Sequence, residues 1–186
     1  MSDLWSLLAR DRRLPLHSPA SVRDAEQVAE GLTGRGLGVL EVPLRTGAAL
    51  PSIAALAGGP LLVGAGTVLS PDQVDESVSA GAGFVVTPGL SLPVVRRCQE
   101  LGVPVLPGVA TPTEVMAALA AGADVVKLFP ARELGGPGYL RALAGPFPQV
   151  RLVPSGGVTR ADAQDYLDLP NVLAVSGSWL CEEAAA

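Results

Sequence analysis

Eight short apolar runs recur roughly every 19 to 25 residues along this chain of 186 residues, and they constrain its fold more than any other feature. The runs cover residues 14–16, 39–42, 61–63, 84–86, 103–106, 125–129, 150–153 and 172–175. Segments that are apolar almost throughout are typical of strands covered on both faces, as in a parallel sheet. The chain therefore predicts eight parallel strands.

Helical patterns lie between these runs, with clear start signals. Ser70 to Gln73 and Thr111 to Glu114 each read as a capping box with proline at the first helical position, where a missing N–H costs nothing. Each box follows a predicted strand. Glycines that can end the helices stand at 34, 81, 102 and 122. Strand and helix thus alternate along the whole chain.

Such an alternation can close into a (β/α)8 barrel or stay an open doubly wound sheet. The first predicted turn, 16–19, contains no glycine, so the nucleotide-binding fingerprint of an open sheet is missing. We therefore predict one α/β domain over residues 1–186, a small (β/α)8 (TIM) barrel. Leu4, Leu7 and Leu8 predict an N-terminal helix, and the few residues after Trp179 predict a short or missing eighth helix.

Composition excludes several functions. No apolar run approaches the roughly 18 to 20 residues that span a bilayer, and the start of the chain does not resemble a signal peptide. Cys98, Cys181 and the lone His17 show no metal or redox spacing, which favours a reducing, cytoplasmic setting. A net charge of −5 with scattered basic residues argues against nucleic acid and membrane partners. A small molecule or another protein is the expected partner.

Lys127 is the only lysine among thirteen basic residues, and it lies inside the apolar run 125–129. Burying a charged amine costs free energy unless its charge is matched or lost. A primary amine in such a place can form a Schiff base with a carbonyl substrate. The alternative is a structural lysine whose stem lies in the core and whose head reaches the rim.

Glu41 is the matching feature, because it is the lone charge in the second run as Lys127 is in the sixth. In a ring of eight strands these two stand opposite each other, so both side chains can project into one interior layer. The pair can be catalytic, or it can be a buried structural ion pair. A nearby carboxylate favours the charged form of the lysine amine, whereas a nucleophilic amine must be neutral. Desolvation or the nearby Arg45 would oppose the effect of the carboxylate and favour the neutral amine.

Polar and small residues follow several predicted strands, at the end of a barrel where active sites lie. Thr67 follows the third run and Thr87 the fourth. Each offers a hydroxyl, although taken alone each fits an ordinary turn or cap better. Glycine-rich turns follow the seventh and eighth runs, at 154–157 and 176–178. Turns at these two positions can present backbone N–H groups to a phosphate.

Seven motifs, in order over nearly the whole chain, resemble those of the 2-keto-3-deoxy-6-phosphogluconate (KDPG) and 4-hydroxy-2-oxoglutarate (KHG) aldolases. They are LEVPLRT at 40–46, GAGTV at 64–68, TPGL at 87–90, PGV at 107–109, VKLFP at 126–130, PSGG at 154–157 and SW at 178–179. The resemblance implies a class I aldolase, a homotrimer of small barrels that acts on a small 2-keto acid and needs neither a metal nor an organic cofactor.

The same resemblance assigns roles to single residues. Lys127 matches the Schiff-base lysine and Glu41 the general acid/base. The residues that match the groups holding the pyruvyl carboxylate and lining the site are Arg45, Thr67, Thr87 and Pro88. Those that match the phosphate-binding loops are Gly156, Gly157 and Ser178.

Ser155 and Pro43 depart from the family pattern, since both stand where the family often has threonine. The position of Ser155 lines the substrate site and is connected with the stereochemistry at substrate C4, so that preference stays open. Pro43 removes a backbone donor beside Glu41. The tail is also shorter than usual, which leaves the trimer contacts open.

The predicted reaction starts with attack of the Lys127 amine on the C2 ketone, while Glu41 relays protons. Cleavage of C3–C4 would release pyruvate together with glyceraldehyde 3-phosphate or glyoxylate. One rival is a sugar-phosphate isomerase or epimerase that uses Glu41 and Lys127 as an acid/base pair. Another is a non-catalytic barrel that binds a phosphorylated metabolite, because fold alone does not establish activity.

Overall fold

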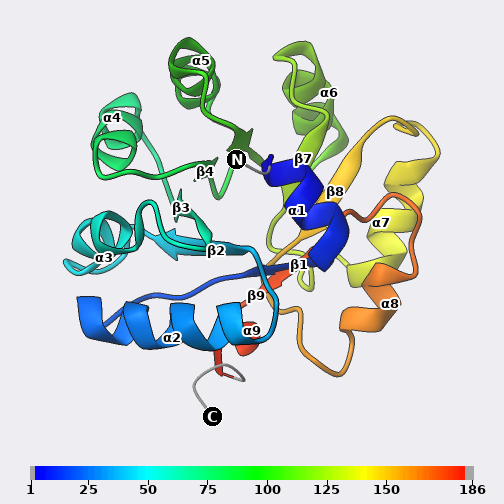
Figure 1. Ribbon diagram of the computed structural model, residues 1–186. Coiled ribbons are helices and arrows are strands. Elements are labelled where there is room, and N and C mark those ends of the chain that lie inside the picture. The colour runs from blue at the N-terminus through cyan, green and yellow to red at the C-terminus, as the bar shows by residue number, and fades with distance from the viewer. Residues whose placement is uncertain (1–2, 183–186) are drawn as a thin grey trace.

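The predicted strands are present and all of their pairings are parallel (Figure 1). The computed structural model describes residues 3–182. The strands are β1 Arg13–Pro15, β2 Val39–Pro43, β3 Leu62–Gly66, β4 Val85–Val86, β5 Val105–Leu106, β6 Gly108–Val109, β7 Val125–Leu128, β8 Arg151–Pro154 and β9 Val175–Gly177. The helices are α1 Leu4–Asp11, α2 Val22–Gly34, α3 Ala49–Leu56, α4 Pro71–Ser79, α5 Leu92–Leu101, α6 Pro112–Ala120, α7 Gly136–Ala144, α8 Ala163–Leu167 and α9 Trp179–Glu182.

The strands close into a ring. Pairing runs in order from β2 to β5, from β6 to β8, and between β9 and β1. Single parallel bridges join Leu16 to Glu41 and Leu152 to Val172, which closes the two seams beside β1 and β9. β5 and β6 are one barrel strand interrupted at Pro107, which has no N–H to donate but whose carbonyl accepts from the Lys127 N–H at 2.9 Å. The predicted (β/α)8 barrel is confirmed.

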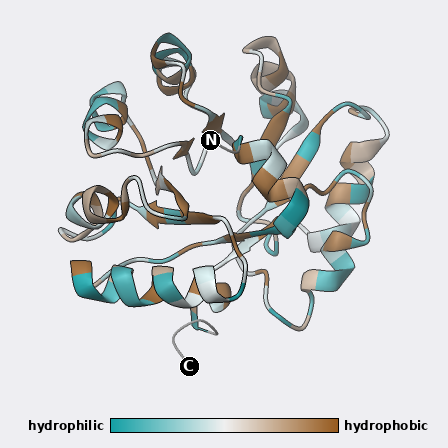
Figure 2. Cartoon of the chain, in the orientation of Figure 1, coloured by the Kyte–Doolittle hydropathy of each residue, from teal (hydrophilic) through white to brown (hydrophobic). Residues whose placement is uncertain are grey.

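The barrel interior is filled with apolar side chains. Those in the middle of the barrel and toward its amino end belong to one buried cluster: Leu14, Val39, Phe84, Val86, Leu106, Val125 and Val153. Two further clusters lie between the strands and the outer helices. In Figure 2 most strand segments have apolar colour, whereas the outer helices carry both apolar and polar colour. Because both faces of each strand are covered, the near-continuous apolar runs are explained.

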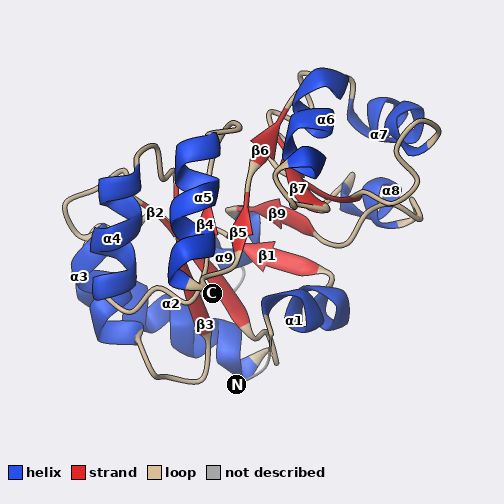
Figure 3. Ribbon diagram, turned by 90° about the horizontal axis from the view of Figure 1, so that it is seen from above, coloured by secondary structure: helices blue, strands red, loops and turns tan. Residues whose placement is uncertain are grey.

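Helix α1 is the predicted N-terminal helix, and it closes the amino end of the barrel. Leu4, Leu7 and Leu8 pack into the interior cluster, and the Asp11 carboxylate accepts from the Gly38 N–H at 2.8 Å, just before β2. In Figure 3, α1 lies at the opposite end of the molecule from β6. Active-site chemistry in barrels belongs to the other end.

Some boundaries differ from those predicted. The last barrel strand begins at Val175 and not at Val172, because Leu173 and Ala174 both pack into the interior cluster and interrupt the alternation of a strand. The capping box at Thr111 is complete, whereas the Gln73 side chain accepts from the Leu69 N–H and not from its N-cap. The eighth barrel helix, α9, has four described residues, in agreement with a short eighth helix.

None of the helices formed by residues 3–182 is long and apolar enough to cross a membrane.

Candidate active site

Lys127 on β7 and Glu41 on β2 meet inside the barrel. Their Nζ and Oε1 atoms are 3.2 Å apart, and the two residues are 4% and 0% exposed. The Lys127 ammonium also lies 5.7 Å from the centre of the Phe129 ring, within the range of a cation–π contact. The predicted meeting of the two lone charges in the barrel interior is confirmed, and the charge of each compensates part of the cost of burying the other.

Glycine on the neighbouring strand makes room for Glu41. A Cβ placed at Gly66 would overlap the Glu41 side chain, so a larger residue there would displace the carboxylate. Glu41 Oε2 has no hydrogen-bond partner among the described residues, although it is buried. A buried carboxylate oxygen without a donor is costly. It is available to a water molecule or to a substrate group.

The Thr87–Gly89 turn packs beside the lysine. Gly108 is in register with Lys127, and a Cβ at Gly108 would overlap the Pro88 carbonyl. The Thr87 hydroxyl accepts from the Gly108 N–H at 3.0 Å and donates to the Gly89 carbonyl at 2.6 Å. Thr87 and Pro88 therefore shape the wall next to Lys127, and the single hydroxyl proton of Thr87 is used by its own turn.

Arg45 and Thr67 lie together where β2 and β3 end. The Arg45 Nε donates to Thr67 Oγ1 at 3.2 Å. Thr67 has a left-handed backbone with φ of 57°, which is uncommon outside glycine and occurs often at functional sites. Arg45 is exposed and Thr67 half-buried. The two residues place a cation and a hydroxyl at the carboxyl end of the strand that carries Glu41.

Gly156 and Gly157 form a left-handed turn after β8, with φ of 87° and 76°. A Cβ at Gly156 would meet the Phe129 ring, and one at Gly157 would meet the Arg132 side chain. Both positions therefore require glycine for conformation and for space. Ser178 is exposed immediately before α9. The two predicted phosphate loops thus follow the neighbouring strands β8 and β9.

Ser155 precedes this turn at the end of β8. It is 3% exposed, its N–H donates to the Leu128 carbonyl at 3.0 Å, and its carbonyl accepts from Ala131 at 2.8 Å. These bonds tie the end of β8 to the end of β7. Ser155 is thereby held one strand away from Lys127.

Arg132 is a residue that the sequence analysis missed. Its N–H donates to the Gly156 carbonyl at 3.0 Å, its stem packs on Gly157, and its guanidinium pairs with Asp162 at 2.8 Å. Burial tends to raise the pKa of Asp162, but donors from Thr159 and Arg132 outweigh it and hold that pKa below its ordinary range. A basic residue two positions after the 126–130 motif was the available signal.

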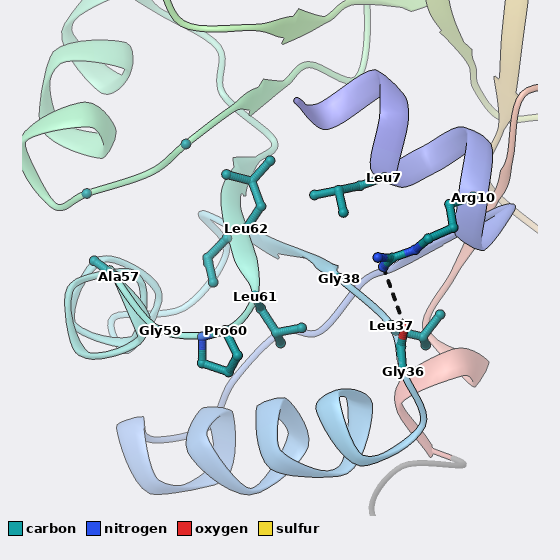
Figure 4. Close-up of a pocket in the computed structure, with 14 residues that line it drawn as sticks. Leu7, Arg10, Gly36, Leu37, Gly38, Ala57, Gly59, Pro60, Leu61 and Leu62 are labelled. Atoms are coloured by element: carbon teal, nitrogen blue, oxygen red, sulfur yellow. Dashed lines mark hydrogen bonds between the residues drawn. The ribbon is translucent and has the colours of Figure 1, made fainter. Parts of the chain in front are cut away.

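A pocket of about 400 Å³ lies at the amino end of the barrel, away from these residues (Figure 4). It is lined by Leu7 and Arg10 of α1 and by glycine-rich turns at 36–38 and 57–63. Arg10 contacts the Gly36 carbonyl at 3.5 Å. None of the predicted site residues lines this pocket, so the polar groups described above are separate from it.

Comparison with known proteins agrees with this geometry. The family model described as KDPG and KHG aldolase matches residues 6–186. A 2-dehydro-3-deoxy-phosphogluconate aldolase of Treponema pallidum is 42% identical over 182 residues, which are 97% of this chain and 87% of the relative.

Two solved structures are similar as well. The KDPG aldolase of Zymomonas mobilis with 3-phosphoglycerate has a TM-score of 0.92 at 38% identity, covering 99% of this chain and 95% of the other. That of Legionella pneumophila, with pyruvate captured as a covalent carbinolamine intermediate, has a TM-score of 0.92 at 34% identity, covering 99% and 97%.

Proposed function

Because the chain belongs to the KDPG and KHG aldolase family, we propose that it is a class I aldolase. It cleaves KDPG to pyruvate and glyceraldehyde 3-phosphate, KHG to pyruvate and glyoxylate, or both. The observation that carries the proposal is the buried contact of 3.2 Å between Lys127 Nζ and Glu41 Oε1. An amine and a carboxylate at this distance can exchange a proton, which is what imine formation requires.

The reaction begins when Lys127 gives a proton to Glu41 and its neutral amine attacks the C2 ketone of the substrate. Protons returned by Glu41 allow water to leave, and an iminium cation forms on Lys127. Glu41 then takes the proton of the C4 hydroxyl. The C3–C4 bond breaks, its electrons pass into the iminium to give an enamine, and the aldehyde departs. Protonation at C3 and hydrolysis release pyruvate and free Lys127.

The groups around the pair suit a 2-keto acid. Arg45 and Thr67, in contact at 3.2 Å, supply a cation and a hydroxyl for the substrate carboxylate. Pro88 and Thr87 form the wall beside Lys127, and Ser155 lines the site between β7 and β8. Support comes from the relative in which pyruvate is captured covalently.

The glycine turn and Ser178 bind the substrate phosphate when one is present. Gly156 and Gly157 offer backbone N–H groups in a left-handed turn, a geometry that suits anions. Arg132 adds a cation to this loop. The Zymomonas structure with 3-phosphoglycerate supports a phosphorylated ligand for this fold.

Pyruvate release from both substrates tests the proposal. The wild-type chain should release pyruvate from at least one of them, and a larger kcat/KM for KDPG would show that the loops contribute binding energy. Lys127→Arg keeps a cation opposite Glu41 but cannot form the imine, so its kcat should fall by about 10⁴-fold or more. Isomerised or epimerised sugar phosphate without pyruvate would instead favour the acid/base rival.

We also propose that residues 1–186 form one domain, that the protein is a homotrimer, and that it works in the cytoplasm. The continuous ring of paired strands supports one domain. Leu69 and Met116, 61% and 62% exposed, are the large apolar side chains that we expect at a contact between subunits. The buried free thiols Cys98 and Cys181 suit a reducing compartment. Light scattering would measure the assembly.

A further inference from the structure

Two buried polar atoms toward the carboxyl end of the barrel have no hydrogen-bond partner among the described residues. They are Glu41 Oε2 and the hydroxyl of Ser176 on β9. Both residues are 0% exposed. Buried polar atoms in native proteins nearly always have a hydrogen-bond partner, which is often an ordered water molecule. Two such atoms at the same end of the barrel therefore call for a shared explanation if they face the same space.

Ser176 faces the barrel interior. Its parallel partner is Leu14, which belongs to the interior cluster, and paired residues of parallel strands point to the same face. Its neighbour Val175 packs in the outer cluster, and a Cβ at Gly177 would meet the outward-lying Trp179. The side chain between these two residues must point the other way, into the barrel.

Ser176 also lies in the same layer as Glu41 and Lys127. In a (β/α)8 barrel the strands are staggered by about one residue per strand, and each interior layer comes from alternate strands. Ser176 pairs with Leu14 of β1, and Leu16, two residues further along β1, bridges to Glu41 of β2. This offset of two residues over two strands equals the stagger of the barrel, so Ser176 and Glu41 lie at the same height along the barrel axis. Lys127 lies at this height too, because it contacts Glu41.

We infer that Ser176 is a positioning residue for Glu41, acting through one water molecule held between its hydroxyl and Glu41 Oε2. The inference rests on the proposed aldolase reaction. Lys127 holds only Oε1, and this contact ends when the amine attacks the substrate. The water bound by Ser176 keeps a donor on the carboxylate throughout the cycle, so Glu41 stays aimed at the atoms between which it moves protons.

Ser176→Ala removes the hydroxyl and tests the inference. We expect kcat for cleavage to fall about tenfold with little change in KM. Proton relay contributes roughly 10²- to 10⁴-fold, and the variant loses the orientation of the Glu41 carboxylate but keeps the carboxylate itself. Exchange of the pyruvate C3 protons with solvent deuterium, followed by NMR, should slow by the same factor.

Ser52→Ala is the matched control. Ser52 on α3 is another fully buried serine whose hydroxyl has no partner among residues 3–182, and it lies outside the barrel, so this variant should match the wild type in both measurements. Ser176→Thr keeps a hydroxyl and should restore most of the exchange rate. Ser176→Cys, which keeps the volume but donates weakly, should resemble the alanine variant and replaces it if that variant is unstable.

Two results distinguish the possible failures. If the wild type neither releases pyruvate nor traps it on borohydride reduction, the proposed function is wrong. If the wild type does both and the Ala and Cys variants at position 176 exchange pyruvate protons at the wild-type rate, the aldolase stands and the role of Ser176 is overturned. An equal loss in Ser52→Ala would likewise overturn it.

Discussion

The two ends of the barrel are built from the same strands but filled in opposite ways. At the amino end, Leu4, Leu7 and Leu8 of α1 complete an apolar core. At the carboxyl end, Glu41 and Lys127 are buried in an ion pair, and one carboxylate oxygen has no partner among residues 3–182. Apolar burial stabilises the fold, whereas burying polar groups costs stability. The amino end therefore holds the barrel together, and the carboxyl end is organised for chemistry.

After Lys127→Arg, Glu41→Gln is expected to have the largest effect on the carboxyl end. The amide keeps the shape of the side chain but cannot accept and return protons, so kcat should fall by about 10³-fold. Steady-state assays of pyruvate release measure this loss. The variant should still fold, as judged by circular dichroism. A kcat within a few-fold of the wild type would mean that Glu41 is only the structural partner of Lys127.

Gly66→Ala should displace the Glu41 carboxylate without changing its chemistry. The new Cβ would overlap the Glu41 side chain, and a misplacement of about 1 Å can cost 10²-fold in rate. We therefore expect kcat to fall by about 10²-fold. Gly138→Ala is the matched control, because nothing lies within 4 Å of a Cβ at Gly138 on α7. Equal rates for the two variants would show that the packing at Gly66 is not needed for catalysis.

Leu8→Ala tests the amino end. Leu8 is 0% exposed in the interior cluster, so its truncation should lower the free energy of unfolding by about 3 kcal/mol, measured by urea denaturation. The kcat of the folded variant should stay near that of the wild type. Leu101→Ala, at a leucine that is 38% exposed, should change stability by about 0.5 kcal/mol or less. A large loss of kcat in Leu8→Ala would remove the contrast between the two ends.

The smallest effect concerns the thiols between the strands and outer helices. Burial raises the pKa of Cys98 from 9.0 to about 11 and that of Cys181 to about 12. The stability that this gives is fully present below pH 9 and is lost as pH rises through the folded-state pKa values. At about pH 10 the loss should be on the order of 1 kcal/mol per thiol. Urea denaturation of Cys98→Ala across this range should show a weaker dependence on pH than the wild type.

Much of this arrangement was predictable from the sequence. Near-continuous apolar runs predicted the strands. Two lone charges in the second and sixth runs predicted the meeting of Glu41 and Lys127, because the second and sixth strands stand opposite each other in a closed ring of eight. The interruption at Leu173 and Ala174 was not predictable, since both residues are apolar and only packing decides which face they take. That interruption brings Ser176 to the inside, so its place beside the pair was equally hidden.

Other features were visible but ambiguous. Thr87 was predicted to line the site and also fitted an ordinary turn, and the structure shows its hydroxyl bonded within the Thr87–Gly89 turn and to Gly108. Arg132 stood next to a recognised motif, but only the fold brings it against Gly157. The roles of these residues in binding and catalysis stay predictions.

Borohydride reduction in the presence of pyruvate tests the central claim most directly, because it asks whether Lys127 forms a covalent imine. Mass spectrometry of digested protein should find a reduced pyruvyl adduct on Lys127, and no such adduct at position 127 of Lys127→Arg. The assignment is clear because Lys127 is the only lysine in the chain, so the amino terminus is the one competing amine. Folded protein that cleaves substrate but carries no adduct on Lys127 would contradict the account.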